Sequence, residues 1–133
     1  MFYKQWVRGA CALFALTAVA AFAAESYPAR PVRVVVPFGA GGPDLIARIV
    51  AQQLASQLGQ PVVVDNRPGA NGIVGTDTVA KAPPDGLVLL LSAQSAMVFN
   101  AVLKKSLPYD PIADFSSVTM VFETPYSPWA IRF

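Results

Sequence analysis

The sequence predicts an α/β fold built on a parallel sheet. The apolar runs 32–36 and 87–91 have the nearly continuous hydrophobic character of strands that are buried on both faces. A third run, 61–64, is short and rich in valine, and segments with helical spacing of apolar residues lie between the runs. Strands that alternate with helices in this way favour a layer of parallel strands joined by right-handed crossovers.

The first strand is expected at Val32–Val36, because its residues are mostly β-branched and Pro37 ends the run. A helix is expected from about Asp44 to Leu58, where the apolar residues keep one stripe on a 3.6-residue period. Gly59 then stands where a glycine commonly follows the end of a helix.

The same cycle then repeats along the chain. The expected elements are a strand at 61–64, a loop at 65–72, a weak helix at 73–82, a turn at 83–86, a strand at 87–91 and a helix at 96–103. Residues 117–122 are a candidate fourth strand.

Residues 1–23 are expected to be a secretory signal peptide. Two basic residues precede an uncharged apolar stretch, and Ala21 and Ala23 fit the small-residue cleavage pattern, so cleavage is expected after Ala23 or Ala24. An uncleaved anchor would need roughly 20 apolar residues, and a lipidated cysteine would end the apolar run, whereas Cys11 precedes most of it. The signal predicts export to a bacterial periplasm.

The composition of the remaining chain limits its chemistry. Removal of the signal takes away two of the ten basic residues and leaves eight against eight acidic ones. This balance is not that of a nucleic-acid binder, which needs a clustered basic face. The only cysteine lies in the signal and the chain has no histidine. We therefore expect no cofactor, no Cys/His metal site and no catalytic activity.

In a parallel sheet, ligands bind beyond the carboxyl ends of the strands, which directs attention to loops 37–44, 66–72 and 92–95. Segment 39–42, Gly-Ala-Gly-Gly, does not match the dinucleotide fingerprint, because Asp44 stands where a glycine is required, and no Gly-Lys-Ser/Thr follows. Small residues at a helix start can instead expose backbone N–H groups to a carboxylate. A simple tight turn is the alternative explanation of the same glycines.

Five polar residues near these loops have ordinary structural explanations. Asn66, Asn71 and Asn100 are each expected to be turn formers or helix caps. Asp44 is expected near a helix start, where the helix dipole favours it, and Arg67 is expected to be solvated or packed along its stem.

Read together, several segments resemble the Bug/TctC family, the periplasmic solute-binding receptors of tripartite tricarboxylate transporters. The matching segments are 27–38, the Gly-Gly turn through Asp44, 59–72, 82–91 and 107–115. The resemblance covers about residues 26–125 and depends on an ordered set of motifs.

The resemblance implies a two-lobed, type II periplasmic-binding-protein fold that closes on a small carboxylated organic acid. It also implies membrane transporter subunits as partners, and a site between the lobes where loops grip the carboxylate largely through backbone N–H groups. The ligand-binding residues that it implies are Phe38, Gly39, Ala40, Gly41, Gly42, Asp44, Ala70, Asn71, Ser92, Ala93 and Gln94.

The sequence also departs from the family pattern. Only Pro43 separates the glycine pair from Asp44, where relatives commonly carry a further residue, often threonine, and the chain is much shorter than such receptors. We therefore expect residues 24–125 to form an incomplete N-terminal α/β lobe and residues 126–133 a divergent tail of a truncated product with weak or no binding. The alternative is a fragment of an anion- or phosphate-binding α/β enzyme, which the missing histidine and cysteine disfavour.

Overall fold

The computed structural model describes residues 27–123. The predicted signal peptide and the predicted tail lie outside this range. Within it, no helix combines the length and the apolar character that a membrane span requires.

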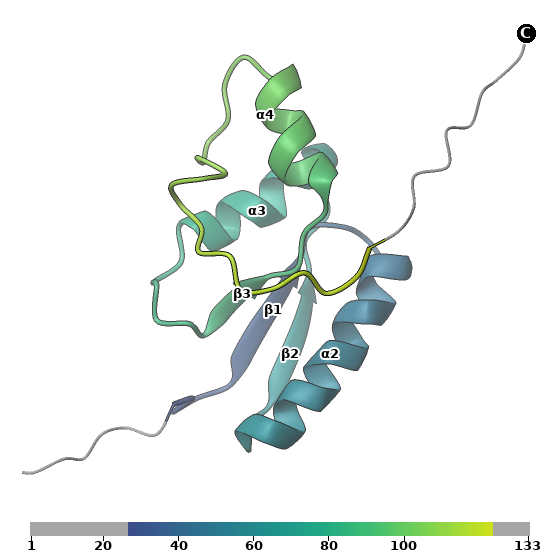
Figure 1. Cartoon of the computed structure of the whole chain (residues 1–133), viewed down its shortest axis with the longest axis vertical. Coiled ribbons are helices and arrows are strands. Elements are labelled where there is room, and N and C mark those ends of the chain that lie inside the picture. Colours follow the sequence, from purple (N-terminus) through teal and green to yellow (C-terminus); the bar gives the residue numbers. More distant parts are fainter. Residues whose placement is uncertain (1–26, 124–133) are drawn as a thin grey trace, which may run out of the picture.

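The centre of the fold is a parallel sheet of three strands in the order β2-β1-β3 (Figure 1). The strands are β1 (Val32–Val36), β2 (Val62–Asn66) and β3 (Val88–Leu90). In β1, Val32 lies opposite Val62 of β2, and Arg33 lies opposite Val88 of β3. The predicted α/β fold with a parallel sheet is confirmed, and β1 has the predicted limits.

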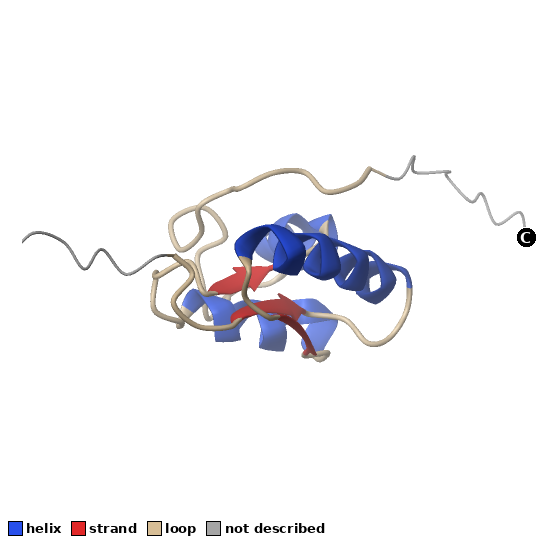
Figure 2. Ribbon diagram, turned by 90° about the horizontal axis from the view of Figure 1, so that it is seen from below, coloured by secondary structure: helices blue, strands red, loops and turns tan. Residues whose placement is uncertain are grey.

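Helices cover both faces of this sheet (Figure 2). The helical elements are α2 (Gly42–Leu58), the 3-10 turn η1 (Ala70–Gly72), α3 (Ile73–Ala80), the π-helical turn η2 (Ser95–Phe99) and α4 (Asn100–Leu103). Helix α2 contacts β1 and β2, whereas α3 contacts β1 and β3 on the opposite face. The predicted helix at 96–103 is therefore present, although its first part is π-helical.

The core forms where β1 meets α2. Val34, Val36, Ala47 and Leu91 are buried against one another. The partly buried residues that pack on them are Phe38, Val62, Val64 and Leu89. Because helices α2 and α3 pack on opposite faces of the sheet and both contact β1, its valines are covered on both faces, and this explains its uninterrupted β-branched sequence.

The ends of several elements differ from the prediction. Strand β2 continues to Asn66, two residues into the predicted loop, because its pairing with β1 persists as far as the bond from Arg67 N–H to Val36 O at 2.8 Å. Helix α3 ends at Ala80 rather than at residue 82. Gly59 follows α2 as predicted, with φ of 66° and its N–H bonded to Ala55 O at 3.1 Å.

Two strand predictions need correction. Strand β3 is only half-buried rather than covered on both faces, because α3 packs on it and α2 packs on β1 and β2 instead. Residues 117–122 do not form a strand, and Val118 and Met120 are 85% and 75% exposed. The segment runs past the sheet without pairing with any described strand (Figure 1), and extended backbone without a partner is not stabilised as a strand.

Candidate functional site

The loops selected from the sequence lie at one edge of the sheet, beyond the carboxyl ends of the strands. The strand order places β1 between the two later strands, so the chain moves first to one side of β1 and then to the other. In open parallel sheets this reversal of order marks the crevice where ligands bind. The connections that follow β1 and β3 border that position.

The connection after β1 leads into the N-terminus of α2, which has no side-chain cap among the described residues. Gly41 is the N-cap residue, and no side chain caps the helix. The first helical hydrogen bond runs from Leu45 N–H to Gly41 O at 3.0 Å. The N–H groups of Gly42 and Asp44 precede that bond and have no partner within the helix, and Pro43 between them has no N–H.

The glycines of this connection are not explained by the fold. Gly39, Gly41 and Gly42 all avoid the left-handed φ region. A Cβ atom added to any of the three would meet no described atom within 4 Å beyond its chain neighbours. Neither backbone conformation nor packing among the described residues therefore demands glycine at these three positions.

Asp44 is buried and bound within the protein. Arg48, one turn later on α2, donates from Nε to Asp44 Oδ2 at 3.1 Å, and its Nη2 lies 3.0 Å from Oδ1. The hydrogen bond from Arg48 lowers the pKa of the Asp44 carboxyl, and partial burial opposes this effect without reversing it. Asp44 therefore stays ionised at neutral pH, and it lies in the first turn of α2 as expected.

Asn66 connects this ion pair to the glycine loop. Its Nδ2 donates to Phe38 O at 3.2 Å, and its Oδ1 accepts from Arg48 Nη2 at 3.4 Å. Asn66 is the last residue of β2, so its expected role as a turn former or cap is wrong. Arg48 is not among the residues predicted from the sequence, and its only signal there is its position four residues after Asp44.

The connection after β2 is shaped by residues in left-handed conformations. Ala70 and Asn71 have φ of 49° and 56°. Asn71 Nδ2 donates to Asn100 Oδ1 at 3.1 Å, and Asn100 Nδ2 donates back to Asn71 O at 3.1 Å. Asn71 is thus a turn former as expected. Asn100, the first residue of α4, is instead buried and links α4 to η1 through these hydrogen bonds.

The three connections meet at Gly72. A Cβ atom there would lie 2.9 Å from Ala96 Cβ, 3.5 Å from Pro37 Cβ and 3.6 Å from Phe38 Cε1. Phe38 is therefore brought close to the segments that carry Ala70, Asn71 and Ala96.

The other predicted site residues lie around this meeting point. Ser92 and Ala93 are half-buried and Gln94 is exposed, between β3 and η2. The space at Gly39, Gly41 and Gly42 is open.

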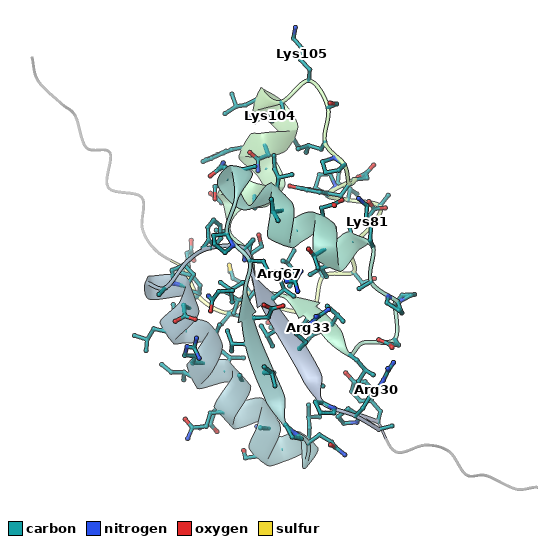
Figure 3. All side chains as sticks on the ribbon, turned by 180° about the vertical axis from the view of Figure 1, so that it is seen from behind. Arg30, Arg33, Arg67, Lys81, Lys104 and Lys105 are labelled. Carbon is teal, nitrogen blue, oxygen red and sulfur yellow. The ribbon has the colours of Figure 1, made fainter. Side chains whose placement is uncertain are left out.

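Among the described residues, the Asp44–Arg48 ion pair is the charged group that these contacts place beside the glycine loop. Arg33 and Arg67 lie near each other beside Asp65, and Arg67 Nε is 2.9 Å from Asp65 Oδ2 (Figure 3). Arg67 is exposed, as expected. Lys104 and Lys105 extend from the far end of the molecule (Figure 3). Because Arg48 is already paired with Asp44, an anion at the glycine loop would be met mainly by backbone groups.

A groove of about 510 Å³ lies away from the predicted loops. It is lined by Ala101, Lys104, Lys105, Ser106, Leu107, Pro108, Tyr109, Asp110, Pro111 and Asp114. Asp110 already accepts hydrogen bonds from the N–H groups of Ala113 and Ile112, which lower its pKa, and Asp114 accepts from Asp110 N–H. Both carboxylates accept hydrogen bonds from backbone N–H groups of the turn at residues 110–114, so the groove is not favoured as the functional site.

A parallel α/β lobe with an open glycine loop at a strand order reversal is typical of a ligand-binding protein. Solved structures place the fold in the class of periplasmic binding proteins. One, described as a periplasmic transporter, is 48% identical, with a TM-score of 0.58, and the match covers 65% of this chain and 29% of that one. MatC from Rhodopseudomonas palustris with bound malate is 38% identical, with a TM-score of 0.61, over 64% of this chain and 29% of that one.

The family follows from the sequence comparisons. Residues 46–128 match TctC, the tripartite tricarboxylate transporter family receptor, and the chain belongs to this family. Protein BugT of Bordetella pertussis is 48% identical over 104 residues, which are 77% of this chain and 32% of BugT. The chain thus spans about a third of the length of this relative. The resemblance inferred from the motifs is confirmed.

Proposed function

We propose that this chain serves as a solute-binding receptor for a small carboxylated organic acid, in the periplasm, for a tripartite tricarboxylate transporter. The observation that carries the proposal is the glycine loop before α2, where Gly39, Gly41 and Gly42 leave space that the described protein does not fill. Family membership supports the receptor role, and the malate bound to MatC supports a dicarboxylate as the class of ligand.

In this proposal the carboxylate is held mainly by backbone. The N–H groups of Gly42 and Asp44 lie at the positive end of the α2 dipole, where an anion is stabilised. The Asp44 carboxylate is already paired with Arg48, so its side chain shapes the loop instead of repelling the ligand. Phe38, Ala70, Asn71 and the segment 92–94 border the same edge and complete this side of the site.

The described residues offer only one wall of such a site, so we propose that the chain alone binds weakly. Two or three hydrogen bonds to a charged group contribute about 1.5–3 kcal/mol each at best. They compete with an association cost of at least about 4 kcal/mol. The expected Kd of the isolated chain for a dicarboxylate is therefore roughly 1 mM or weaker.

The proposal also assigns the remaining segments. Residues 1–23 would be removed on export, residues 24–125 would form the first lobe, and membrane transporter subunits would receive the solute. N-terminal sequencing of the exported protein tests the first assignment, with a start at residue 24 or 25 expected. Recovery of Met1 on a membrane-bound product would contradict it.

An anion- or phosphate-binding enzyme fragment is the lesser alternative. The relatives are binding receptors rather than enzymes, which fits a non-enzymatic role. An enzyme would also need a positioned acid, base or nucleophile, and the Asp44 carboxylate nearest the loop is occupied by Arg48.

Titration of the chain with malate, followed by NMR, tests the proposed function. We expect the amide resonances of Gly39 to Asp44 to shift with millimolar malate, and Gly41→Val to weaken binding by at least tenfold, because its side chain fills the open space. The control is Arg67→Ala, an exposed neighbour already tied to Asp65, which should bind malate as the unchanged chain does. Loss of binding in Arg67→Ala alone would replace the backbone site by a side-chain charge clamp.

A further inference from the structure

In the peptide group between Phe38 and Gly39, the C=O group is hydrogen-bonded to a side chain and, within the described range, the N–H group is not. Asn66 Nδ2 donates to Phe38 O at 3.2 Å across 28 positions of sequence. On the other side, the N–H of Gly39 has no acceptor among residues 27–123, and the space at Gly39 is open. One edge of this peptide is therefore fixed by the protein, and the other is free to meet a ligand.

The geometry of the peptide bond couples these two edges. In a trans peptide the C=O and N–H groups point in opposite directions. The Phe38–Gly39 bond is trans, since the only cis bond in the described range joins Tyr27 to Pro28. Holding the carbonyl of Phe38 toward Asn66 therefore directs the N–H of Gly39 away from Asn66.

The orientation of the Asn66 amide is itself determined. Arg48 Nη2 donates to Asn66 Oδ1 at 3.4 Å, so the amide oxygen faces Arg48 and the NH₂ group faces Phe38. Arg48 is anchored in turn by Asp44, with Nε to Oδ2 at 3.1 Å. An asparagine side chain suits this position because one amide supplies both the acceptor and the donor.

We propose that Asn66 is a positioning residue of the carboxylate site, which presents the Gly39 N–H as a ready donor by holding the Phe38 carbonyl. The inference rests on the proposed function and adds a residue from β2 that does not itself contact the ligand. A donor oriented before binding avoids the cost of ordering the loop when the ligand arrives. Asn66 thus affects affinity through a neighbouring peptide.

The first experiment needs no ligand. NMR spectra of the chain with ¹³C-labelled carbonyls and ¹⁵N-labelled amides are compared for the unchanged protein, Asn66→Ala and Asn66→Leu. Leucine approximates the size of asparagine and lacks the amide, so it keeps the test usable if the alanine variant does not fold. We expect both the Phe38 carbonyl and the Gly39 amide resonances to move, with those of Gly86 unchanged. A Gly39 resonance that stays in place overturns the inference.

The second experiment measures affinity. We expect Asn66→Leu to weaken malate binding about tenfold, the loss of one charge-assisted donor. The urea unfolding midpoint of Asn66→Leu should stay close to that of the control Arg67→Ala. If Asn66 had a purely structural role, lost affinity would be accompanied by a lower midpoint. Unchanged malate affinity with a displaced Gly39 resonance overturns the inference and leaves the proposed function intact. Failure of the unchanged chain to shift at Gly39 to Asp44 with malate overturns both.

Discussion

The connections that follow β1 and β2 start from the same edge of the sheet and both depend on glycine, yet for different reasons. After β1, Gly39, Gly41 and Gly42 have ordinary φ angles and open space around them. After β2, Gly69 and Gly72 have φ of 144° and 87°, and a Cβ on either would lie 2.9 Å from another side chain.

This difference separates two uses of one residue type. The glycines after β2 are required by the fold, because the backbone there adopts conformations, and approaches neighbours, that other residues do not tolerate. The glycines after β1 are not required by any described contact, and in the proposed function their small size leaves room for the ligand. The following predictions test that contrast, from the largest expected effect to the smallest.

The largest effect is expected for Gly75→Ala, in the first turn of α3. Its Cβ would lie 2.8 Å from Arg67 O and 2.8 Å from Pro37 Cα, both of them backbone atoms that cannot turn away. We expect a loss of about 2 kcal/mol or more of unfolding free energy, although alanine is normally the better helix former. Urea unfolding measures it. An unchanged midpoint would mean that the packing of α3 on the sheet is looser than described.

Asn100→Ala is expected to have the next largest effect. Asn100 is 2% exposed and exchanges hydrogen bonds with Asn71 in both directions. Its removal should cost about 1–3 kcal/mol by leaving buried polar groups of η1 unpaired. The matched control is Val98→Ala on the same helical segment, a half-exposed residue that should change stability little. Equal effects in the two variants would contradict a specific role for the Asn71–Asn100 pair.

A smaller effect on stability is expected when the pH is lowered and the Asp44 carboxylate becomes protonated. Because its pKa is lowered in the folded protein, Asp44 contributes stability above the unfolded pKa of about 3.9, and this contribution is lost as pH falls through the lower folded pKa. Thermal unfolding between pH 2 and 6 should therefore show a steeper acid loss in the unchanged chain than in Asp44→Asn. Asp110, whose pKa is also lowered, remains in both proteins and cancels from the comparison. Parallel curves would show that the Arg48 pair contributes nothing.

The smallest effect on stability is expected for Gly41→Ala. The position has open space and no left-handed φ, so alanine fits the folded backbone. Stability should be unchanged or raised by up to about 1 kcal/mol, since alanine restricts the unfolded chain. Calorimetric unfolding measures this. A loss comparable to that of Gly75→Ala would remove the distinction between the two connections.

The sequence predicts the central strand well and the edges less well. Strand β1 has a strand on each side and helices on both faces, so its residue pattern fits only a buried strand. Residues 117–122 have strand-like residues, but no strand in the described part of the chain pairs with them. A strand depends on its partner, and local composition does not reveal whether a partner is present.

The candidate site shows the same limit. The glycine loop was visible as a motif, but the contacts of Asn66 with Phe38 and of Asn100 with Asn71 join residues 28 and 29 positions apart. Each asparagine alone looks like a turn former, and only the folded chain brings it to its partner. Arg48 was missed for a related reason, because a single arginine on a helix is ordinarily a solvated residue.

The open glycines have a consequence for the history of this lineage. A copy of the gene released from selection for solute binding could exchange Gly39, Gly41 or Gly42 for alanine or serine with little harm to folding, while changes at Gly72 or Gly75 would still be removed through misfolding. The first connection would therefore drift before the second.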